Sequence, residues 1–235
     1  MAGAEEEFQA VTFTRELKFT ATPDKGEVSA ILVRPESATQ LLVLGHGAST
    51  NMRHATMQSI AEALAARGIA TFRYNFPYSE NGRGRDSQAV CTETIRSAVQ
   101  AAHKAAPDLT LLAGGHSFGG RMTTTAQAEE PIENVAGLVL FSFPLHLPGR
   151  PDTKRAEHLA NIKIPMLFLS GMRDELATLD LLEPTIKKLG KHAALHLIDT
   201  ANHSYKILKK TRSSDEDVFA EMAGKTLSWI AEIGV

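Results

Sequence analysis

The stretch LLAGGHSFGGR, residues 111–121, decides how this sequence is interpreted, because it sets one serine among four glycines directly after an apolar run. Glycine costs backbone entropy inside a regular element, so such a cluster needs a steric reason. A sharp turn from a strand into a helix is one, since side chains at the flanking positions would collide there. The G-x-S-x-G pattern of Gly115, Ser117 and Gly119 predicts such a turn, with the serine hydroxyl raised as a nucleophile.

A phosphate-binding turn at a helix N-terminus is the alternative interpretation of the same glycines. The dinucleotide-binding spacing G-x-G-x-x-G is absent, and glycine pairs flank the serine instead. We therefore favour the nucleophile, on condition that a strand precedes it, a helix follows it, and an acid and a histidine come later in the chain.

Length and composition place the chain among ordinary globular proteins. It has 235 residues, 43% of them hydrophobic and 22% charged, and a formal net charge of −2. We expect one domain over residues 1–235, large enough to need no disulfide or metal for stability. The balance of charge argues against a nucleic-acid-binding surface or an anionic-membrane surface.

The sequence also bears on location. The single cysteine, Cys91, excludes an internal disulfide. The acidic start MAGAEEEFQA lacks the apolar segment of a secretory signal, and the longest nearly apolar run, 136–145, is too short to span a bilayer. We expect a cytoplasmic protein with no membrane association.

The pattern of apolar residues predicts the fold class. Alternation over 8–20 and 28–34, with the turn signal PDKG at 23–26, predicts an antiparallel hairpin. Continuous apolar runs, typical of strands buried on both faces of a parallel sheet, occupy 41–44, 69–72, 109–113, 135–143, 165–169 and 193–198. Helical patterns occupy 54–66, 86–106, 118–130, 176–189 and 216–233. Together they predict an α/β sandwich, a mostly parallel twisted sheet with helices on both faces.

Candidate catalytic partners of the serine follow two of these strands, where sites of open α/β sheets lie. Asp174 comes shortly after the run 165–169 and His203 after 193–198, so the order is serine, acid, histidine, as in α/β-hydrolases. The imidazole removes the serine proton, and the carboxylate orients the imidazole. Glu175 is a rival acid, but Asp174 lies closer to its strand end; Asp199 lies too near its own strand and is interpreted as structural.

An oxyanion hole is predicted from the loop after the first parallel strand. This loop reads GHGA at 45–48, where the backbone N–H of Ala48, or of Gly47 as the second choice, is one expected donor. The N–H of Phe118, directly after the nucleophile, is the other. His46 suits either a base or a brace for the loop, and we favour the brace.

Further residues are expected to shape the substrate pocket. Candidate substrate-binding residues are His46, His116, Tyr74 in the expected loop 74–78, Arg83 and Arg85 in the expected loop 81–85, and His146 in the segment 144–150. The two arginines either hold an anionic group or are simply solvated. Convergence of His46, His116 and His203 on a metal lacks supporting ligand spacing, so we expect no metal and no cofactor. The short segment before the strand at 165 leaves no room for a large lid and predicts an open cleft.

Five segments together resemble the KANL/Tex-type family of α/β-hydrolase-like proteins, and more distantly the dienelactone-hydrolase-like enzymes. They are HGA (46–48), GGHSFGGR (114–121), FSFPLHLPG (141–149), LFLSGMRDE (167–175) and ANHSYK (201–206). The resemblance implies an α/β-hydrolase fold with Ser117, Asp174 and His203 at the triad positions. It implies no substrate, and some family members look like scaffold or regulatory proteins. His116 departs from the family pattern, in which arginine tends to precede the serine.

The sequence therefore predicts a serine hydrolase that acts on the ester, thioester or small amide of a small-molecule acyl substrate. The alternative is an interaction or regulatory protein that keeps the fold without catalysis. A blocked oxyanion loop, or a His203 that points away from Ser117, would favour that alternative. Acyl transfer or haloperoxidase-like chemistry by the same triad is a third, weaker alternative, which differs from hydrolysis in the acceptor that reaches the acyl-enzyme.

Overall fold

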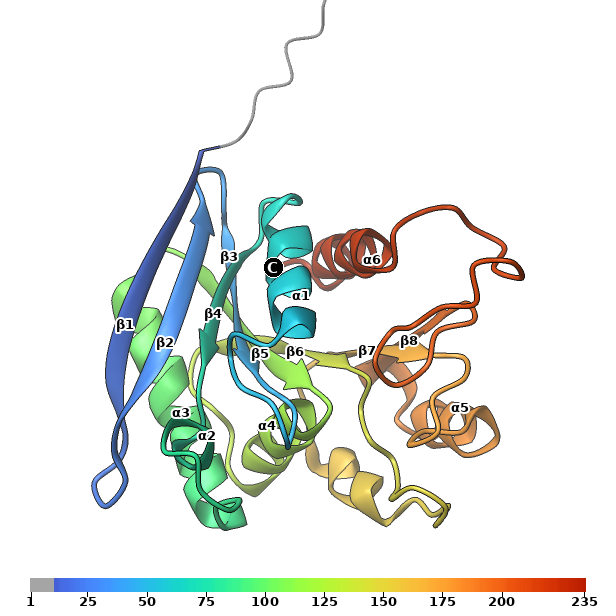
Figure 1. The fold of residues 1–235 in the computed structure, drawn as a ribbon, viewed down its shortest axis with the longest axis horizontal. Helices are drawn as coiled ribbons and strands as arrows, with labels where there is room; N and C mark the ends of the chain where they lie inside the picture. Colours follow the sequence, from blue (N-terminus) through green and yellow to red (C-terminus); the bar gives the residue numbers. More distant parts are fainter. Residues whose placement is uncertain (1–10) are drawn as a thin grey trace, which may run out of the picture.

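The strands of the computed structural model, which describes residues 11–235, form one eight-stranded sheet (Figure 1). Its order is β1-β2-β4-β3-β5-β6-β7-β8, with β1 and β2 paired antiparallel, β2 and β4 antiparallel, and every later pair parallel. The strands are β1 (Thr12–Thr22), β2 (Gly26–Pro35), β3 (Gln40–Gly45), β4 (Ala70–Tyr74), β5 (Thr110–His116), β6 (Val135–Phe141), β7 (Met166–Gly171) and β8 (Ala193–Ile198).

Helices cover both faces of the sheet, each over its own hydrophobic core (Figure 1). One face carries α1 (Ala55–Ala65) and α6 (Val218–Ile233). The opposite face carries α2 (Pro77–Glu80), α3 (Gln88–Ala105), α4 (Phe118–Glu129) and α5 (Leu179–Lys188), together with the 3₁₀ helix η1 (Lys154–Asn161). A second 3₁₀ turn, η2 (Gly190–His192), leads into β8. The prediction of a mostly parallel sheet with an N-terminal hairpin and helices on both faces is confirmed.

Local signals in the sequence set the helix ends. The side chain of Ser87 accepts a hydrogen bond from Val90 N at the start of α3, and Asp217 accepts from Phe219 N and Ala220 N at the start of α6. These caps satisfy N–H groups that have no partner inside the helix. α6 ends at Gly234, whose φ of 75° is accessible to glycine at little cost.

The structure corrects two details of the predicted elements. β4 runs to Tyr74, so this residue belongs to a buried strand and not to the loop after it. The next segment forms the short helix α2, opened by Pro77 at its first position, where the missing N–H of proline costs nothing. The predicted start of the first strand, at residues 8–10, lies outside the described residues.

The connection from β6 to β7 is short. Residues 142–165 contain an isolated bridge between Leu147 and Arg150 and the helix η1, which packs Ala156 and Leu159 into the core beside α4. Within the described residues no large lid is inserted here, as the sequence predicted.

The order of the strands opens a crevice at one end of the sheet. β3 lies between β4 and β5, so the chain leaves β3 toward one side and later returns on its other side. At such a switch point the loops after the two strands diverge, and ligands of α/β proteins bind between them. The loops after β3 and β5 are those in which the sequence places the oxyanion hole and the nucleophile.

Candidate active site

Ser117 occupies the sharp turn between β5 and α4. Its backbone has φ 52° and ψ −114°, a conformation that a non-glycine residue adopts at a cost of about 1–3 kcal/mol. Its N–H donates to Phe141 O over 2.8 Å, which ties the turn to β6. A Cβ atom on Gly119 would lie 2.2 Å from Gly45 O, and one on Gly115 would lie 2.5 Å from the same oxygen. The flanking glycines are therefore needed because β3 passes directly against the turn.

His203 lies between the serine and an acid. Its Nε2 atom is 2.8 Å from Ser117 Oγ, and its Nδ1 atom is 2.8 Å from Asp174 Oδ2 and 2.9 Å from Oδ1. Asp174 is 3% exposed, and its Oδ1 also accepts from Leu176 N over 2.8 Å. With its proton on Nδ1, the imidazole donates to the carboxylate and presents a lone pair to the hydroxyl. The three predicted residues thus form one continuous series of hydrogen bonds.

The rival acids lie elsewhere. Glu175 is exposed, and within the described residues its carboxylate has no hydrogen bond to His203. Asp199 accepts from Ser213 N over 2.7 Å and from Ser213 Oγ over 2.8 Å, so its carboxylate closes the loop that follows β8.

The loop that carries His203 is held by its own side chains. Asn202 Oδ1 accepts from Ser204 N over 3.1 Å and from Lys206 N over 3.0 Å. Tyr205 OH donates to Leu169 O on β7 over 2.9 Å. These bonds to the neighbouring strand and turn restrict the positions that the imidazole can take.

The loop after β3 is anchored through one carbonyl group. Gly47 O accepts from His46 Nδ1 at 2.8 Å, from Thr50 Oγ1 at 3.1 Å and Thr50 N at 3.3 Å, and from Tyr78 OH at 3.4 Å. In a trans peptide the next N–H points away from the carbonyl oxygen. Anchoring Gly47 O on one side therefore aims the N–H of Ala48 toward the other.

His46 is completely buried, and both of its ring nitrogens meet the backbone. Nδ1 donates to Gly47 O, while Nε2 accepts from Phe76 N over 3.2 Å. Burial lowers the pKa of His46 to about 4, so the ring is neutral near pH 7. These contacts are those of a brace for the loop, with no ring nitrogen left to contact substrate.

The two N–H groups expected to form the oxyanion hole have no hydrogen-bond partner among residues 11–235: neither Ala48 N nor Phe118 N is paired. Phe118 is the first residue of α4, whose opening N–H groups have no partner within the helix. Both donors therefore remain available to a developing negative charge.

His116 lies behind the histidine of the triad. It is 8% exposed, its Nε2 is 3.4 Å from His203 O, and the two imidazole centroids are 5.7 Å apart. Burial, followed by the charge of His203, lowers the pKa of His116 to about 4. A neutral His116 with its proton on Nε2 donates to the backbone of the His203 loop.

The other expected pocket residues are divided between core and surface. Tyr74 is 1% exposed and packs its ring 5.4 Å from that of Phe76, so it is a core residue. His146 is 1% exposed and its Nδ1 donates to Leu147 O over 3.0 Å. Arg83 and Arg85 are both exposed, and Arg85 holds its guanidinium carbon 5.3 Å from the ring centroid of Phe118.

Sequence reasoning missed Arg121, whose guanidinium carbon lies 5.7 Å from the ring centroid of Phe118. Its spacing of one helical turn from Ser117 was a signal that could have identified it, since such residues share a helix face. Tyr78 and Thr50, which hold Gly47 O, had no comparable signal, because their contact depends on the packing of separate segments.

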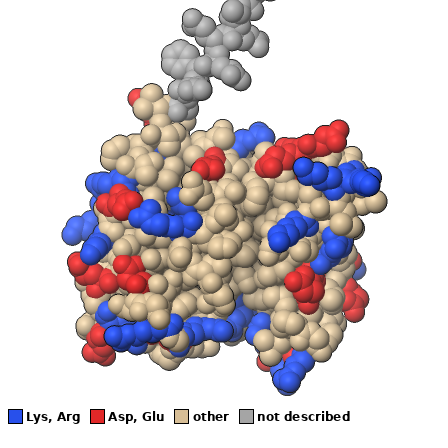
Figure 2. All heavy atoms as spheres, in the orientation of Figure 1, with Lys and Arg blue, Asp and Glu red and all other residues tan. Residues whose placement is uncertain are grey.

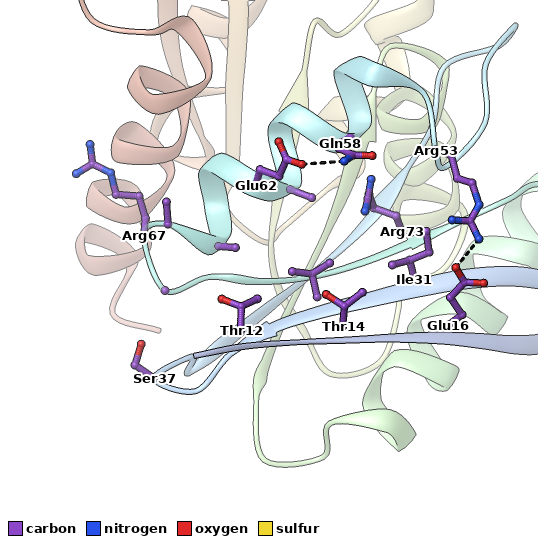
Figure 3. Close-up of a pocket in the computed structure, with 15 residues that line it drawn as sticks. Thr12, Thr14, Glu16, Ile31, Ser37, Arg53, Gln58, Glu62, Arg67 and Arg73 are labelled. Atoms are coloured by element: carbon purple, nitrogen blue, oxygen red, sulfur yellow. Dashed lines mark hydrogen bonds and ion pairs between the residues drawn. The ribbon is translucent and has the colours of Figure 1, made fainter. Parts of the chain in front are cut away.

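A large hollow of about 1010 Å³ lies away from the triad, between α1 and the strands β1, β2 and β4 (Figure 3). Two pairs of its polar side chains engage each other: Arg53 pairs with Glu16 at 2.7 Å and Gln58 Nε2 donates to Glu62 at 2.8 Å. Arg73, 5% exposed, points into it and donates to Met52 O over 3.2 Å. No residue of the candidate triad lines this hollow.

The described part of the chain has neither a metal-binding cluster nor a helix that could span a membrane. No cluster of three or more His, Cys, Asp or Glu side chains in residues 11–235 has an arrangement that would hold a metal ion. In the same residues, no helix combines the length and apolar character required to cross a bilayer.

Residues 38–231 match the family model described as "Alpha/beta hydrolase domain". A dienelactone hydrolase from Anabaena variabilis is similar in structure, with a TM-score of 0.71 and 19% identity over 93% of this chain and 98% of that chain.

Two further solved structures show the same likeness. Est1E from Butyrivibrio proteoclasticus, with ferulic acid bound, has a TM-score of 0.68 and 19% identity over 87% of this chain and 96% of that chain. An α/β serine hydrolase without a lid from Xanthomonas campestris has a TM-score of 0.68 and 18% identity over 93% of this chain and 94% of that chain. At these identities the likeness shows a shared fold.

Proposed function

The chain belongs to the family of alpha/beta hydrolase domains, and from that premise we propose that it is a serine hydrolase acting on an ester, thioester or small amide. The observation that carries the proposal is the series of hydrogen bonds from Asp174 through His203 to Ser117, with 2.8 Å at the reacting end. The esterase and hydrolase names of the structural neighbours are consistent with this reaction class.

In the first half of the reaction, Ser117 Oγ attacks the carbonyl carbon of the substrate while His203 Nε2 takes the hydroxyl proton. Asp174 keeps the second imidazole proton on Nδ1 and stabilises the imidazolium cation. The carbonyl oxygen becomes an oxyanion that accepts hydrogen bonds from the N–H groups of Phe118 and Ala48. Loss of one such donor typically costs about 2.7–4 kcal/mol of transition-state stabilisation.

In the second half, the tetrahedral intermediate expels the alcohol, thiol or amine, which takes the proton from His203. The remaining acyl-enzyme reacts with water, whose proton passes to His203 as the new bond to the carbonyl carbon forms. Breaking the bond to Ser117 Oγ returns that proton to the serine and releases the acid. The cycle regenerates the enzyme and consumes one water, with no step that calls for a metal or a cofactor.

Within the wider family we also propose that the chain is a KANL/Tex-type member. The segments FSFPLHLPG at 141–149 and ANHSYK at 201–206 support this placement. Scaffold roles among such proteins make the non-catalytic alternative worth testing directly, although a His203 oriented toward Ser117 argues against it.

Labelling with a fluorophosphonate probe tests the proposal. We expect rapid labelling of the wild type and none of Ser117→Ala or His203→Ala. Ser204→Ala is the matched control, because this exposed serine neighbours the histidine and its hydroxyl has no place in the mechanism. If the folded wild type is not labelled, the proposal of hydrolase activity is refuted and the interaction-protein alternative is favoured. If Ser117→Ala is still labelled, the assignment of Ser117 as the nucleophile is refuted.

A further inference from the structure

Three arginines gather beside the residue that follows the proposed nucleophile. The guanidinium carbons of Arg85 and Arg121 lie 5.3 and 5.7 Å from the ring centroid of Phe118, within the range of cation–π contacts. Arg155 is the third member, because its positive charge, like that of Arg85, repels the positive charge of Arg121. Burial, then these two charges, lower the pKa of Arg121, which nevertheless stays protonated near pH 7.

The three cations form no ion pair within the described residues, although the negative charge of Asp152 acts on Arg155. No carboxylate lies within 4.0 Å of the guanidinium groups of Arg85, Arg121 or Arg155. Arg155 donates to a neutral group, His146 O, over 3.0 Å. Arg121 and Arg155 are partly buried, and Arg85 is exposed beside them. Like charges repel one another more strongly when partly buried than in water, so an anion placed among the three would be stabilised.

The acidic residues nearby are already engaged. Asp86 pairs with Lys25 at 2.8 Å and accepts from Tyr78 N at 2.7 Å. Glu129 accepts from Gln88 Nε2 at 2.9 Å. Asp86 is therefore neutralised by Lys25, whereas Glu129, bonded to a neutral amide, keeps its negative charge and is outnumbered by the three arginines.

A surface hollow of about 530 Å³ opens beside this cluster, between α4 and η1. Its lining includes the cations Arg121, Lys154 and Arg155, the polar side chains of Thr125 and His158, and one acidic residue, Glu129. Figure 2 shows Lys and Arg side chains gathered along the lower edge of the face shown, over the part of the molecule where Figure 1 places α2, α3 and α4. The hollow has room for a carboxylate or phosphate group with its adjoining atoms.

The cluster is also close to the reacting bond. Arg121 N donates to Ser117 O over 3.0 Å, so the two residues are one helical turn apart, about 6 Å along the α4 axis. Phe118, on whose ring two of the arginines converge, supplies a proposed oxyanion donor from its own N–H. An anion bound by the guanidinium groups of Arg85 and Arg121 beside the Phe118 ring would therefore lie near the proposed oxyanion donor on the same residue.

We propose that the substrate carries an anionic group, a carboxylate or a phosphate, near its scissile acyl bond, and that Arg121 binds this group together with Arg85 and Arg155. This inference rests on the proposed hydrolase function and names its substrate class. Guanidinium groups suit the role because their paired N–H donors match the two oxygens of a carboxylate or phosphate.

Two esters of matched shape test the substrate class. The p-nitrophenyl monoester of succinic acid differs from p-nitrophenyl butyrate in having a carboxylate where butyrate has a methyl group. After subtraction of the Ser117→Ala background, we expect wild-type kcat/KM to favour the anionic ester by about tenfold or more. Arg121→Gln should abolish most of that preference, Arg121→Lys should retain part of it, and Arg85→Gln should reduce it independently.

Arg150→Gln is the matched control, because it removes one positive charge from an exposed arginine outside the cluster. The ratio of the two esters cancels any general loss of activity, and thermal melts establish that each variant is folded. Equal kcat/KM for both esters in the wild type, or a preference that persists in folded Arg121→Gln and Arg85→Gln, would refute the proposed anion site. Neither result would contradict the proposed hydrolase activity.

Competition identifies the anion. Inorganic phosphate and succinate are added to wild type and Arg121→Gln during hydrolysis of the neutral ester, and the anion that inhibits only the wild type is the class bound. If the wild type hydrolyses neither ester and resists fluorophosphonate, the hydrolase proposal fails. Calorimetric titration with phosphate and succinate then decides the anion site alone: binding lost in Arg121→Gln supports it, and no binding to the wild type overturns it.

Discussion

Replacing Asp174 by asparagine tests the proposed triad with almost no change of shape. The carboxylate faces two donors, His203 Nδ1 at 2.8 and 2.9 Å and Leu176 N at 2.8 Å. An asparagine keeps its carbonyl oxygen for Leu176 N and then turns its NH₂ group toward the imidazole. Nδ1 must become the acceptor, which moves the imidazole proton to Nε2.

That proton then points at Ser117 Oγ, 2.8 Å away, and occupies the lone pair that should accept the serine proton. In a serine protease the same carboxylate-to-amide change lowers kcat by about 10⁴-fold through the wrong tautomer, which corresponds to about 5.5 kcal/mol of activation free energy. We expect a loss of similar size here. Folding should be little affected, since the replacement is isosteric and removes a buried charge.

The assay is hydrolysis of p-nitrophenyl butyrate together with the rate of fluorophosphonate labelling, and urea unfolding measures stability. Glu175→Gln is the matched control, because it neutralises the adjacent, exposed carboxylate. A folded Asp174→Asn protein that loses less than tenfold in kcat, or a Glu175→Gln protein that loses as much, would refute the assignment of the acid.

Three further outcomes are expected. Gly119→Ala should destabilise the protein by about 1–3 kcal/mol in urea unfolding, because the added Cβ would lie 2.2 Å from Gly45 O. Gly84→Ala is the control and should change stability little, because no atom lies within 4 Å of its added Cβ. Equal stabilities of the two variants would contradict the close approach of β3. Thr50→Val removes a 3.1 Å hydrogen bond to Gly47 O, and such a bond contributes about 0.5–1.5 kcal/mol. We therefore expect kcat to fall about 2- to 10-fold with KM little changed. An unaltered kcat would show that this bond does not position the oxyanion loop. Burial lowers the pKa of His46 and His116 from 6.5 to about 4, so between these pH values the unfolded chain binds more protons than the folded one. The free energy of unfolding should therefore fall as pH drops from 6.5 toward 4. Urea unfolding at several pH values should show a weaker pH dependence for His116→Gln than for the wild type, and an identical dependence would contradict a neutral buried His116.

The strands and helices could be predicted because their signals are local. β8 matches the predicted run 193–198 residue for residue, and α4 begins at Phe118 as expected, since both depend on side chains that are close neighbours in the chain. The errors arose where a local signal was ambiguous. The sequence predicts a loop over 74–78, but Tyr74 closes a buried strand and Pro77 begins a helix.

The candidate site was predictable in part for the same reason. Strand ends could be located, and parallel strands bring their carboxyl ends to one edge of the sheet, so Ser117, Asp174 and His203 were expected to meet. The bracing of Gly47 O by Tyr78, and the convergence of Arg85, Arg121 and Arg155, were not predicted. These contacts join segments that share no periodicity, and no spacing in the chain encodes them.

The sequence by itself determined the fold class, the turn at Ser117 and the order of the candidate catalytic residues. The spacing of apolar residues, the glycines and the capping residues determine local structure over a few neighbouring positions. Tertiary structure decided the strand order, the 2.8 Å approach of His203 to Ser117 and the unpaired arginines beside Phe118. The physical reason is the sequence separation over which each interaction acts: backbone sterics and helix capping involve residues that are close together in the chain. Hydrogen bonds and charges between distant segments exist only after packing has brought those segments together.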